Sequence, residues 1–219
     1  MKKDVKDLKN SHKGEDVWVL ASGGSMNFID GSFFDNKVTV GVNRICRFFK
    51  CDYVVSKDTR GFGEIGEAIG NPIPILSKHN CGNVWDHLNT MESLHYIFDH
   101  PPKPGERPML DAIHKDSDQI IVSYSTITSA IHFAAYTGAK NIIICGHDCG
   151  SINDKVVIEG YYDKIRPVQG STEGYKQWLS QIEGHSVAVR EKLKKEYGCN
   201  IYSLNPFLNV GLENNVYKK

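Results

Sequence analysis

The densest group of reactive side chains in this sequence lies between two glycines, in the segment Gly146-His147-Asp148-Cys149-Gly150. Flanking glycines let the backbone approach a ligand closely, which brings His147 and Asp148 near it. A carboxylate in such a loop binds ribose hydroxyls or a metal ion, and an imidazole with a pKa of about 6.5 acts as an acid or a base. The segment is therefore a candidate site, with a purely structural role for His147 as the alternative.

A glycine-rich segment, Ser22-Gly23-Gly24-Ser25, follows the first apolar run of the chain. A turn of this kind between a strand and a helix directs backbone N–H groups and the positive end of the helix toward a phosphate or another anion. The segment matches neither the dinucleotide-binding pattern G-x-G-x-x-G nor the phosphate-binding loop G-x-x-x-x-G-K-[ST]. A tight turn in which Ser25 caps a helix is the alternative interpretation.

Two pairs of polar residues stand at comparable places further along the chain. Asn43 has an amide that donates and accepts at once, which suits a sugar hydroxyl or the edge of a base, and Arg44 can neutralise a phosphate. Thr128 and Ser129 either cap a helix or donate their hydroxyls to an anion at its N-terminus. For both pairs, local turn or cap formation explains the residue types equally well.

Three further side chains have the chemistry to move a proton or to stabilise a leaving group. His185 lies in a predicted helix, next to Gly184, where it could reach the edge of a sheet as a general base. Tyr161 and Tyr162 follow the His147 segment and could donate hydrogen bonds to a departing phosphate. The alternatives are a surface histidine on the helix and two tyrosines that pack a lid.

The periodicity of the sequence predicts the elements that position these residues. Short apolar runs bounded by turn residues are typical of strands buried on both faces of a parallel sheet. They occupy residues 16–21, 38–42, 52–56, 119–123, 141–145 and 200–204. Helical spacing marks residues 126–138 and 173–197, each ending at a glycine. We therefore expect an α/β fold, a Rossmann-like and mostly parallel sheet flanked by helices, in which the four polar segments meet at the carboxyl ends of the strands.

The middle of the chain, residues 59–118, lacks this regularity. It holds six of the eight prolines and only short strand candidates, at residues 73–76 and 95–98. Proline interrupts both helices and sheet hydrogen bonding, so we expect an irregular, proline-rich insertion that flanks the sheet as a lid or acceptor site. Residues 1–219 then form one domain, and residues 1–13 a frayed tail or a short amphipathic helix.

Composition excludes several classes of partner. The 26 basic and 26 acidic side chains give a net charge of zero, without the basic excess of a protein that binds nucleic acid. The apolar runs are far shorter than the roughly 20 residues of a transmembrane segment, and the start lacks the apolar run of a secretory signal. We therefore expect a cytoplasmic protein with six reduced cysteines and a small-molecule partner, and with a homo-oligomer as one possible assembly.

In order along the chain, these segments resemble motifs of the bacterial family-42 sialyltransferases and of the related motility-accessory-factor and archaeal hydroxymethylpterin-pyrophosphokinase-like domain. Ala21-Ser22-Gly23-Gly24-Ser25-Met26 is similar to the family's opening G-N-G-P-S-L, with Ser22 in place of Asn and Gly24 in place of Pro. Val42-Asn43 stands where the family has Cys-Asn. The other similarities are Ile127-Thr128-Ser129-Ala130 to I-T-S-G, Gly146-His147-Asp148 to G-I-D, Gly184-His185-Ser186 to G-H-S, and Ile201-Tyr202-Ser203-Leu204-Asn205-Pro206 to L-Y-C-L-C-P.

The resemblance implies a glycosyltransferase that takes a sugar from a nucleotide-activated donor similar to CMP-sialic acid. The glycine-rich loop, Asn43 and the Thr128-Ser129 pair would bind the donor, and a glycan or another hydroxyl compound would be the acceptor. Transfer in such a family is inverting and requires neither a metal nor another cofactor. His185 would then deprotonate the acceptor hydroxyl, and Tyr161 or Tyr162 would stabilise the departing phosphate.

Two other functions remain open at this point. The pyrophosphokinase-like relatives suggest transfer of diphosphate from Mg-ATP to a pterin alcohol, for which Asp58 and Asp148 are the candidate metal ligands. Ser56-Lys57-Asp58 supplies one carboxylate where such an enzyme is expected to have a pair. A noncatalytic nucleotide-binding module would keep the glycine-rich loop and have no need of His185 or the tyrosines.

Overall fold

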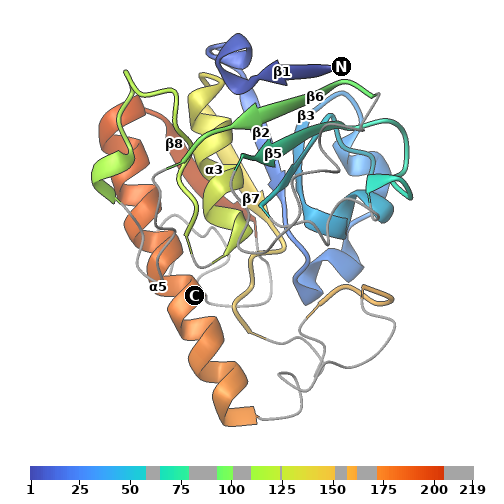
Figure 1. Cartoon of the computed structure of the whole chain (residues 1–219). Coiled ribbons are helices and arrows are strands. Elements are labelled where there is room, and N and C mark those ends of the chain that lie inside the picture. The colour runs from blue at the N-terminus through green and yellow to red at the C-terminus, as the bar shows by residue number, and fades with distance from the viewer. Residues whose placement is uncertain are drawn as a thin grey trace.

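The chain folds around a parallel sheet of eight strands in the order β1-β6-β5-β4-β3-β2-β7-β8 (Figure 1). The computed structural model describes residues 1–57, 65–78, 93–100, 110–123, 125–150, 157–161 and 172–204, with only the backbone for residues 172–176. The strands are β1 (Lys2–Asp4), β2 (Asp16–Leu20), β3 (Val38–Val42), β4 (Tyr53–Ser56), β5 (Ile73–Ser77), β6 (His95–Phe98), β7 (Asn141–Cys145) and β8 (Asn200–Leu204).

Helices cover both faces of this sheet. On one face α3 (Thr126–Tyr136) packs across β2, β3, β4 and β7, and α5 (Thr172–Tyr197) packs against α3 and β8 (Figure 1). On the other face lie three short 3-10 helices, η2 (Gly24–Phe28), η3 (Gly31–Phe34) and η4 (Asn43–Arg47). Two further 3-10 helices, η1 (Val5–Leu8) and η5 (Leu110–Ala112), complete the described elements. The architecture is the expected α/β, Rossmann-like fold.

The inner strands, unlike the edge strands β1 and β8, are largely apolar because each face of the sheet meets its own core. In β2, Val17 and Val19 enter the cluster under α3, whereas Leu20 enters the cluster under the 3-10 helices. In β7, Ile142 and Ile143 divide between the two clusters in the same way. Successive side chains of a strand point to opposite faces, so a continuous apolar run is what a doubly covered strand requires.

The ends of both long helices follow the predicted chemistry. Helix α3 ends in a Schellman arrangement, with Gly138 at φ +88° and its N–H donating to Ala135 O, while Ala139 N–H donates to Ala134 O. Helix α5 ends before Gly198, at φ +68°, whose N–H donates to Lys194 O. A left-handed conformation at these positions strains other residues, which is why glycine stops the helix there.

Within residues 59–118, the prediction that the segment only flanks the sheet is wrong for its described part. Strands β5 and β6 lie inside the sheet, between β4 and β1. Pro74 fits in β5 because Ile73 N–H already points to β4, so the N–H that proline lacks would face β6. Pairing with β6 starts one residue later, at Ile75, and no ladder bond is lost.

Two other expectations about the backbone are corrected. Residues 119–123 form no strand: Gln119 makes a single bridge to Asp99, and Ile121 N–H then donates to the ring of His132 in α3. Of the two alternatives for the N-terminal residues, the frayed tail is wrong, because β1 pairs with β6, and the short helix is present as η1, which buries Val5 and Leu8. In the described part of the chain, no helix is long and apolar enough to cross a membrane.

The chain order places the switch point of the sheet between β2 and β7. From β2 the chain continues to η2 on one face, and from β7 it continues toward α5 on the other. Ligands of open α/β sheets bind in the crevice outside the carboxyl ends of two such strands. The loops after β2, β3, β4 and β7 and the start of α3 are therefore the places to look for a site.

Candidate functional site

The loops that follow β2 and β7 are bound directly to each other. Gly23 N–H donates to Gly146 O over 2.7 Å. The carboxylate of Asp148 accepts the N–H of Ser25 at Oδ2 and the hydroxyl of Ser25 at Oδ1, each over 2.7 Å. Asp148 is buried, and burial raises the pKa of its carboxyl while the two bonds from Ser25 lower it. The Ser25 donors proposed to face an anion thus face a carboxylate of the protein itself.

The glycines of these two loops are required by this close approach. A Cβ on Gly23 would lie 2.4 Å from Asp148 Oδ2 and 2.5 Å from Gly146 O. A Cβ on Gly146, which has φ +71°, would lie 2.5 Å from the carbonyl oxygen of Ala21. All three distances are well inside van der Waals contact, so the glycines permit the two loops to meet. Ser22 contributes its carbonyl, which accepts Ile158 N–H over 2.8 Å.

Asn43, the first residue after β3, combines an unusual backbone with an unsatisfied side chain. Its φ is +53°, in the left-handed region. Its Nδ2 reaches Thr126 Oγ1 at 3.4 Å, and its Oδ1 is buried without a hydrogen-bond partner. Whichever way the amide is turned, one end lies near Thr126 and the other end meets no polar group. Asn43 therefore joins the end of β3 to the first residue of α3 and has hydrogen-bonding capacity left over.

The start of α3 lies at the same edge. Ser125, the residue before the helix, makes no side-chain capping bond. The first N–H groups of α3 therefore receive no hydrogen bond from a capping side chain. Thr128 and Ser129 are fully buried, and their hydroxyls donate to Ser125 O over 2.7 Å and to Ile121 O over 2.8 Å. Both hydroxyl protons therefore make hydrogen bonds within the protein. The hydroxyl of Thr126, in the same turn, lies beside Asn43.

Arg44 and Tyr161, predicted separately as phosphate ligands, contact each other. Arg44 Nη1 donates to Tyr161 O over 2.7 Å, and its guanidinium lies 5.7 Å from the centre of the Tyr161 ring. The same ring stacks on Phe48, with centroids 6.1 Å apart, and Tyr161 is buried. Arg44 thus fastens the segment after β7 onto η4. Tyr162 lies outside the described residues.

His185 reaches the carboxyl edge of the sheet from α5. Its Nδ1 lies 3.3 Å from Ser123 Oγ, on the segment that leads into α3. The carbonyl of Ser123 accepts a hydrogen bond of 2.6 Å from Lys57 Nζ, at the end of β4. The structure therefore brings the predicted base to the strand ends, in a row that runs from β4 through Ser123 to α5.

His147 holds α5 in place beside His185. Ser186 Oγ donates to Ile182 O over 2.8 Å, so at 2.7 Å it accepts the Nε2–H of His147. The sulfur of Cys149, at φ +49°, lies 3.8 Å from His147 Nδ1. Burial and the charge of Arg190 lower the pKa of His147 to about 4, which keeps the ring neutral at pH 7. A neutral imidazole that donates to Ser186 positions the helix.

No protein-family model matches the sequence, and no curated protein matches it significantly. Among solved structures, the chain is similar in fold to the MAf glycosyltransferase from Magnetospirillum magneticum AMB-1. The TM-score is 0.54 at 12% identity over 91% of this chain, which spans only 35% of that protein. The sialyltransferase CstII from Campylobacter jejuni, solved with cytidine-5'-monophosphate, aligns over 94% of this chain and 89% of its own at 14% identity, with a TM-score of 0.49. At such identities the likeness concerns the fold.

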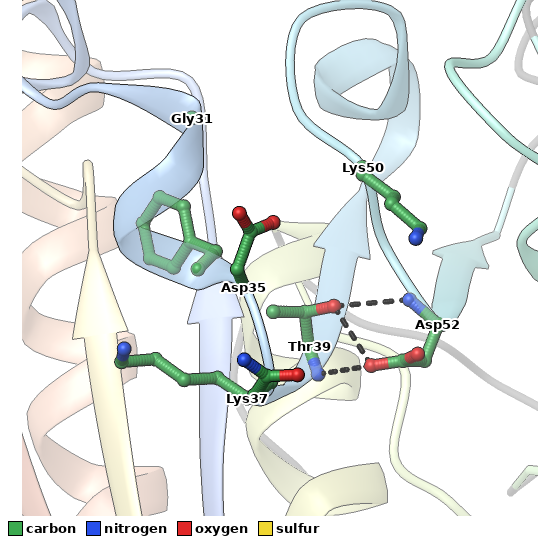
Figure 2. A pocket seen from close by; sticks show the side chains of 8 residues that line it. Gly31, Asp35, Lys37, Thr39, Lys50 and Asp52 are labelled. Carbon is green, nitrogen blue, oxygen red and sulfur yellow. Dashed lines mark hydrogen bonds between the residues drawn. The ribbon is translucent and has the colours of Figure 1, made fainter.

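A hollow of about 240 Å³ elsewhere on the molecule contains none of the predicted site residues (Figure 2). It lies by the starts of β3 and β4, at the amino-terminal ends of the strands, whereas the candidate site lies at their carboxyl ends. There Asp52 Oδ2 accepts the N–H of Thr39 over 2.8 Å and its hydroxyl over 3.0 Å, which leaves that carboxylate already bonded. The hollow is lined by Gly31, Phe34, Asp35, Asn36, Lys37, Thr39, Lys50 and Asp52.

The metal-dependent alternative rests on Asp58 and Asp148. Asp58 lies outside the described residues, and both oxygens of Asp148 accept hydrogen bonds from Ser25. In the described ranges, no three histidine, cysteine, aspartate or glutamate side chains are placed to share a metal ion. The described part of the site offers amide, hydroxyl and ammonium groups, which suit a nucleotide and its sugar.

Sequence reasoning missed Lys57, Ser123 and Thr126. Lys57 directly follows a predicted strand, so the rule that selected Asn43 applied to it as well. Thr126 is the first residue of α3, a place where a hydroxyl faces out of the helix, whereas Thr128 and Ser129 lie within it. Ser123 offered no signal, because its partners, Lys57 and His185, are 66 and 62 residues away in the chain.

Proposed function

We propose that this chain is a glycosyltransferase that transfers a sugar from a donor similar to CMP-sialic acid to a hydroxyl acceptor. The fold, which resembles a region of a Magnetospirillum glycosyltransferase, is compatible with that activity. The observation that supports the proposal most is the side chain of Asn43, which has one buried amide atom without a hydrogen-bond partner.

A bound nucleotide sugar would explain both properties of Asn43. A buried polar atom without a partner costs about 1–3 kcal/mol, and a left-handed conformation adds a smaller cost, because asparagine adopts it more readily than most non-glycine residues. Such costs persist where the residue serves a ligand, and an amide recognises groups that both donate and accept, as sugar hydroxyls and base edges do. Asn43 is at the end of β3, next to the N-terminus of α3, where the helix dipole favours an anionic phosphate.

His185 supplies the acid–base chemistry in this proposal. Its Nε2 takes the proton of the acceptor hydroxyl as the acceptor oxygen forms a bond to the anomeric carbon of the sugar. The bond from that carbon to the phosphate oxygen breaks, and CMP leaves with the electron pair. Tyr161 or Tyr162 would stabilise the leaving phosphate, and no metal or other cofactor enters the reaction.

Calorimetric titration with CMP tests the nucleotide site. Binding of CMP in the presence of EDTA, weakened about tenfold or more in Asn43→Ala, is the expected result. Asn141→Ala is the matched control, because Asn141 donates to Asp16 at the opposite edge of the sheet. Equal affinities in the two variants, or binding of ATP with magnesium and not of CMP, would contradict the proposal.

Turnover tests the role of His185. Release of CMP from CMP-sialic acid, with water or a supplied glycan as acceptor, should fall by about 10²-fold or more in His185→Ala, with CMP affinity unchanged. His114→Ala is the control, since His114 is an exposed histidine paired with Asp116. Wild-type turnover in His185→Ala would remove His185 from the mechanism.

A further inference from the structure

The short segment before α3 is held in place by hydrogen bonds from two parts of the fold. Lys57 Nζ, from the residue after β4, donates to Ser123 O over 2.6 Å. Within α3, the hydroxyl of Ser129 donates to Ile121 O over 2.8 Å, and the ring of His132 accepts Ile121 N–H over 3.0 Å. Ser123 is therefore buried in a fixed position, although its segment forms no strand.

The hydroxyl of Ser123 reaches the ring of His185 in α5. Ser123 Oγ lies 3.3 Å from His185 Nδ1. The backbone of α5 is held at the same point, because the neighbouring Ser186 accepts the Nε2–H of His147 over 2.7 Å. The ring and the backbone of His185 are thus positioned by separate contacts, one from the segment before α3 and one from the loop after β7.

The contact with Ser123 bears on which ring nitrogen of His185 carries a proton. A neutral imidazole has one N–H group and one nitrogen that accepts, and a serine hydroxyl can donate or accept. If Nδ1–H donates to Ser123 Oγ, the accepting nitrogen is Nε2. If the hydroxyl donates to Nδ1, the proton of the ring is on Nε2. Only the first arrangement lets Nε2 take a proton from an acceptor hydroxyl.

We infer that Ser123 is a positioning residue, which accepts the Nδ1–H of His185 and so makes Nε2 the basic nitrogen. This inference rests on the proposed function and adds a residue to it. During transfer the proton of the acceptor hydroxyl moves to Nε2, while the proton on Nδ1 stays bonded to Ser123 Oγ. The ring becomes positively charged, and a hydrogen bond from a charged donor is stronger than one from a neutral donor. Ser123 therefore stabilises the ring more in the transition state than in the ground state.

The ¹⁵N NMR spectrum of the histidine rings tests this contact without any substrate. In a neutral ring, the nitrogen with a proton and the nitrogen without one have well-separated shifts, and the spectrum of His185→Gln assigns the signals. At a pH of about 8, where an ordinary histidine is neutral, wild-type His185 should carry its proton on Nδ1. Ser123→Ala should show a mixture of both tautomers. A proton on Nε2 in the wild type, or an unchanged tautomer in Ser123→Ala, would overturn the inference.

Steady-state release of CMP from CMP-sialic acid tests the role of Ser123 in the reaction. In Ser123→Ala we expect kcat to fall about tenfold or more, with KM and CMP affinity within about twofold of wild type, because the lost bond serves the charged ring and not the donor. Ser117→Ala is the matched control, since its hydroxyl accepts Gln119 N–H over 3.1 Å in the same part of the chain. A wild-type kcat in Ser123→Ala, or an equal loss in Ser117→Ala, would contradict the role of Ser123.

Two features of the design separate this inference from folding and from the proposed function. The tautomer of the wild type is measured without any substitution at Ser123, and thermal melting with CMP titration shows that Ser123→Ala is folded with its donor site intact. A wild type that neither binds CMP nor releases it from CMP-sialic acid would contradict the proposed function. An active wild type whose kcat is unchanged in Ser123→Ala would contradict the role of Ser123 alone.

Discussion

Ser25 donates two hydrogen bonds, from its backbone N–H and its hydroxyl, to the carboxylate of Asp148, 123 residues away in the chain. This contact joins the loops that follow β2 and β7. The carboxylate lies at the start of η2, where the backbone N–H of Ser25 donates to it. In the proposed function, ligand recognition therefore rests on Asn43 at the end of β3 and not on these donors of Ser25.

The Ser25–Asp148 contact depends on the missing side chain of Gly23. Gly23→Ala would place a Cβ 2.4 Å from Asp148 Oδ2 and 2.5 Å from a backbone oxygen, so one of the two loops must shift. We expect a loss of about 1–3 kcal/mol in the free energy of unfolding, measured by urea denaturation.

A substitution of a second glycine serves as a control, with the opposite expected change in the free energy of unfolding. Gly184 lies inside α5, with nothing within 4 Å of a Cβ built on it. Gly184→Ala should therefore stabilise the protein by about 1 kcal/mol through helix propensity. A stability for Gly23→Ala that equals or exceeds that of the wild type would show that the two loops are not held as described.

Two substitutions of Asn43 test its contributions to stability and to ligand binding separately. Glycine adopts φ +53° without penalty, whereas alanine is strained there by about 1 kcal/mol. Asn43→Gly has no unsatisfied amide and should unfold at the same urea concentration as wild type or at a higher one, and Asn43→Ala should unfold at a lower one than Asn43→Gly. Both variants lack the amide, so both should bind CMP weakly. Retention of CMP affinity in Asn43→Gly would show that the backbone, and not the amide, is the functional feature.

Most of the fold follows from local sequence features. Continuous apolar runs identified β2, β3, β4 and β7 because a strand covered on both faces needs no polar residue. The same rule predicted a strand before α3, where none forms. Ile120 and Ile121 are fully buried, but Ile121 N–H donates to the ring of His132 and not to a neighbouring strand. Burial alone does not distinguish the two cases.

The site was less predictable than the fold, for a physical reason. Sequence position shows which residues follow a strand, and that rule placed Asn43 at the edge of the sheet. Sequence position does not show which donors already make hydrogen bonds within the protein. Ser25 donates to Asp148, and the hydroxyl of Ser129 donates to Ile121 O. Those partners lie at other positions in the chain, so only the three-dimensional structure identifies them.

Two buried histidines make stability depend on pH. Burial lowers the pKa of His132 to about 3, and burial together with Arg190 lowers that of His147 to about 4. The unfolded chain binds protons at both residues near its ordinary pKa of about 6.5, whereas the native protein does not. Stability should therefore fall as the pH drops from about 6.5 to about 4, with each histidine contributing a slope of about 1.4 kcal/mol per pH unit.

Urea denaturation at a series of pH values measures this slope. His132→Gln and His147→Gln each remove one titrating group, so each should reduce the slope in that range by about one proton. Below a pH of about 3 the native histidines are protonated as well, and their contribution to the slope ends. A variant with the full wild-type slope would show that the replaced histidine is protonated in the native protein.

The last prediction concerns the segment that Arg44 fastens to η4. Arg44→Met keeps the aliphatic part of the side chain and loses the 2.7 Å bond to Tyr161 O. That bond and the stacking on Phe48 hold residues 157–161 over the glycine-rich loop, where Ile158 N–H donates to Ser22 O. Loss of one charge-assisted bond corresponds to faster local opening by about tenfold, seen as faster hydrogen exchange at Ile158.

Arg47→Met is the matched control for this measurement. Arg47 belongs to the same 3-10 helix, but its guanidinium pairs with the exposed Glu67 at 2.8 Å. An exposed pair of this kind contributes little to stability, so exchange at Ile158 should remain at the wild-type rate. Similar acceleration in both variants would mean that η4 as a whole, and not the Arg44–Tyr161 bond, holds the segment. Acceleration in Arg44→Met alone assigns that role to Arg44.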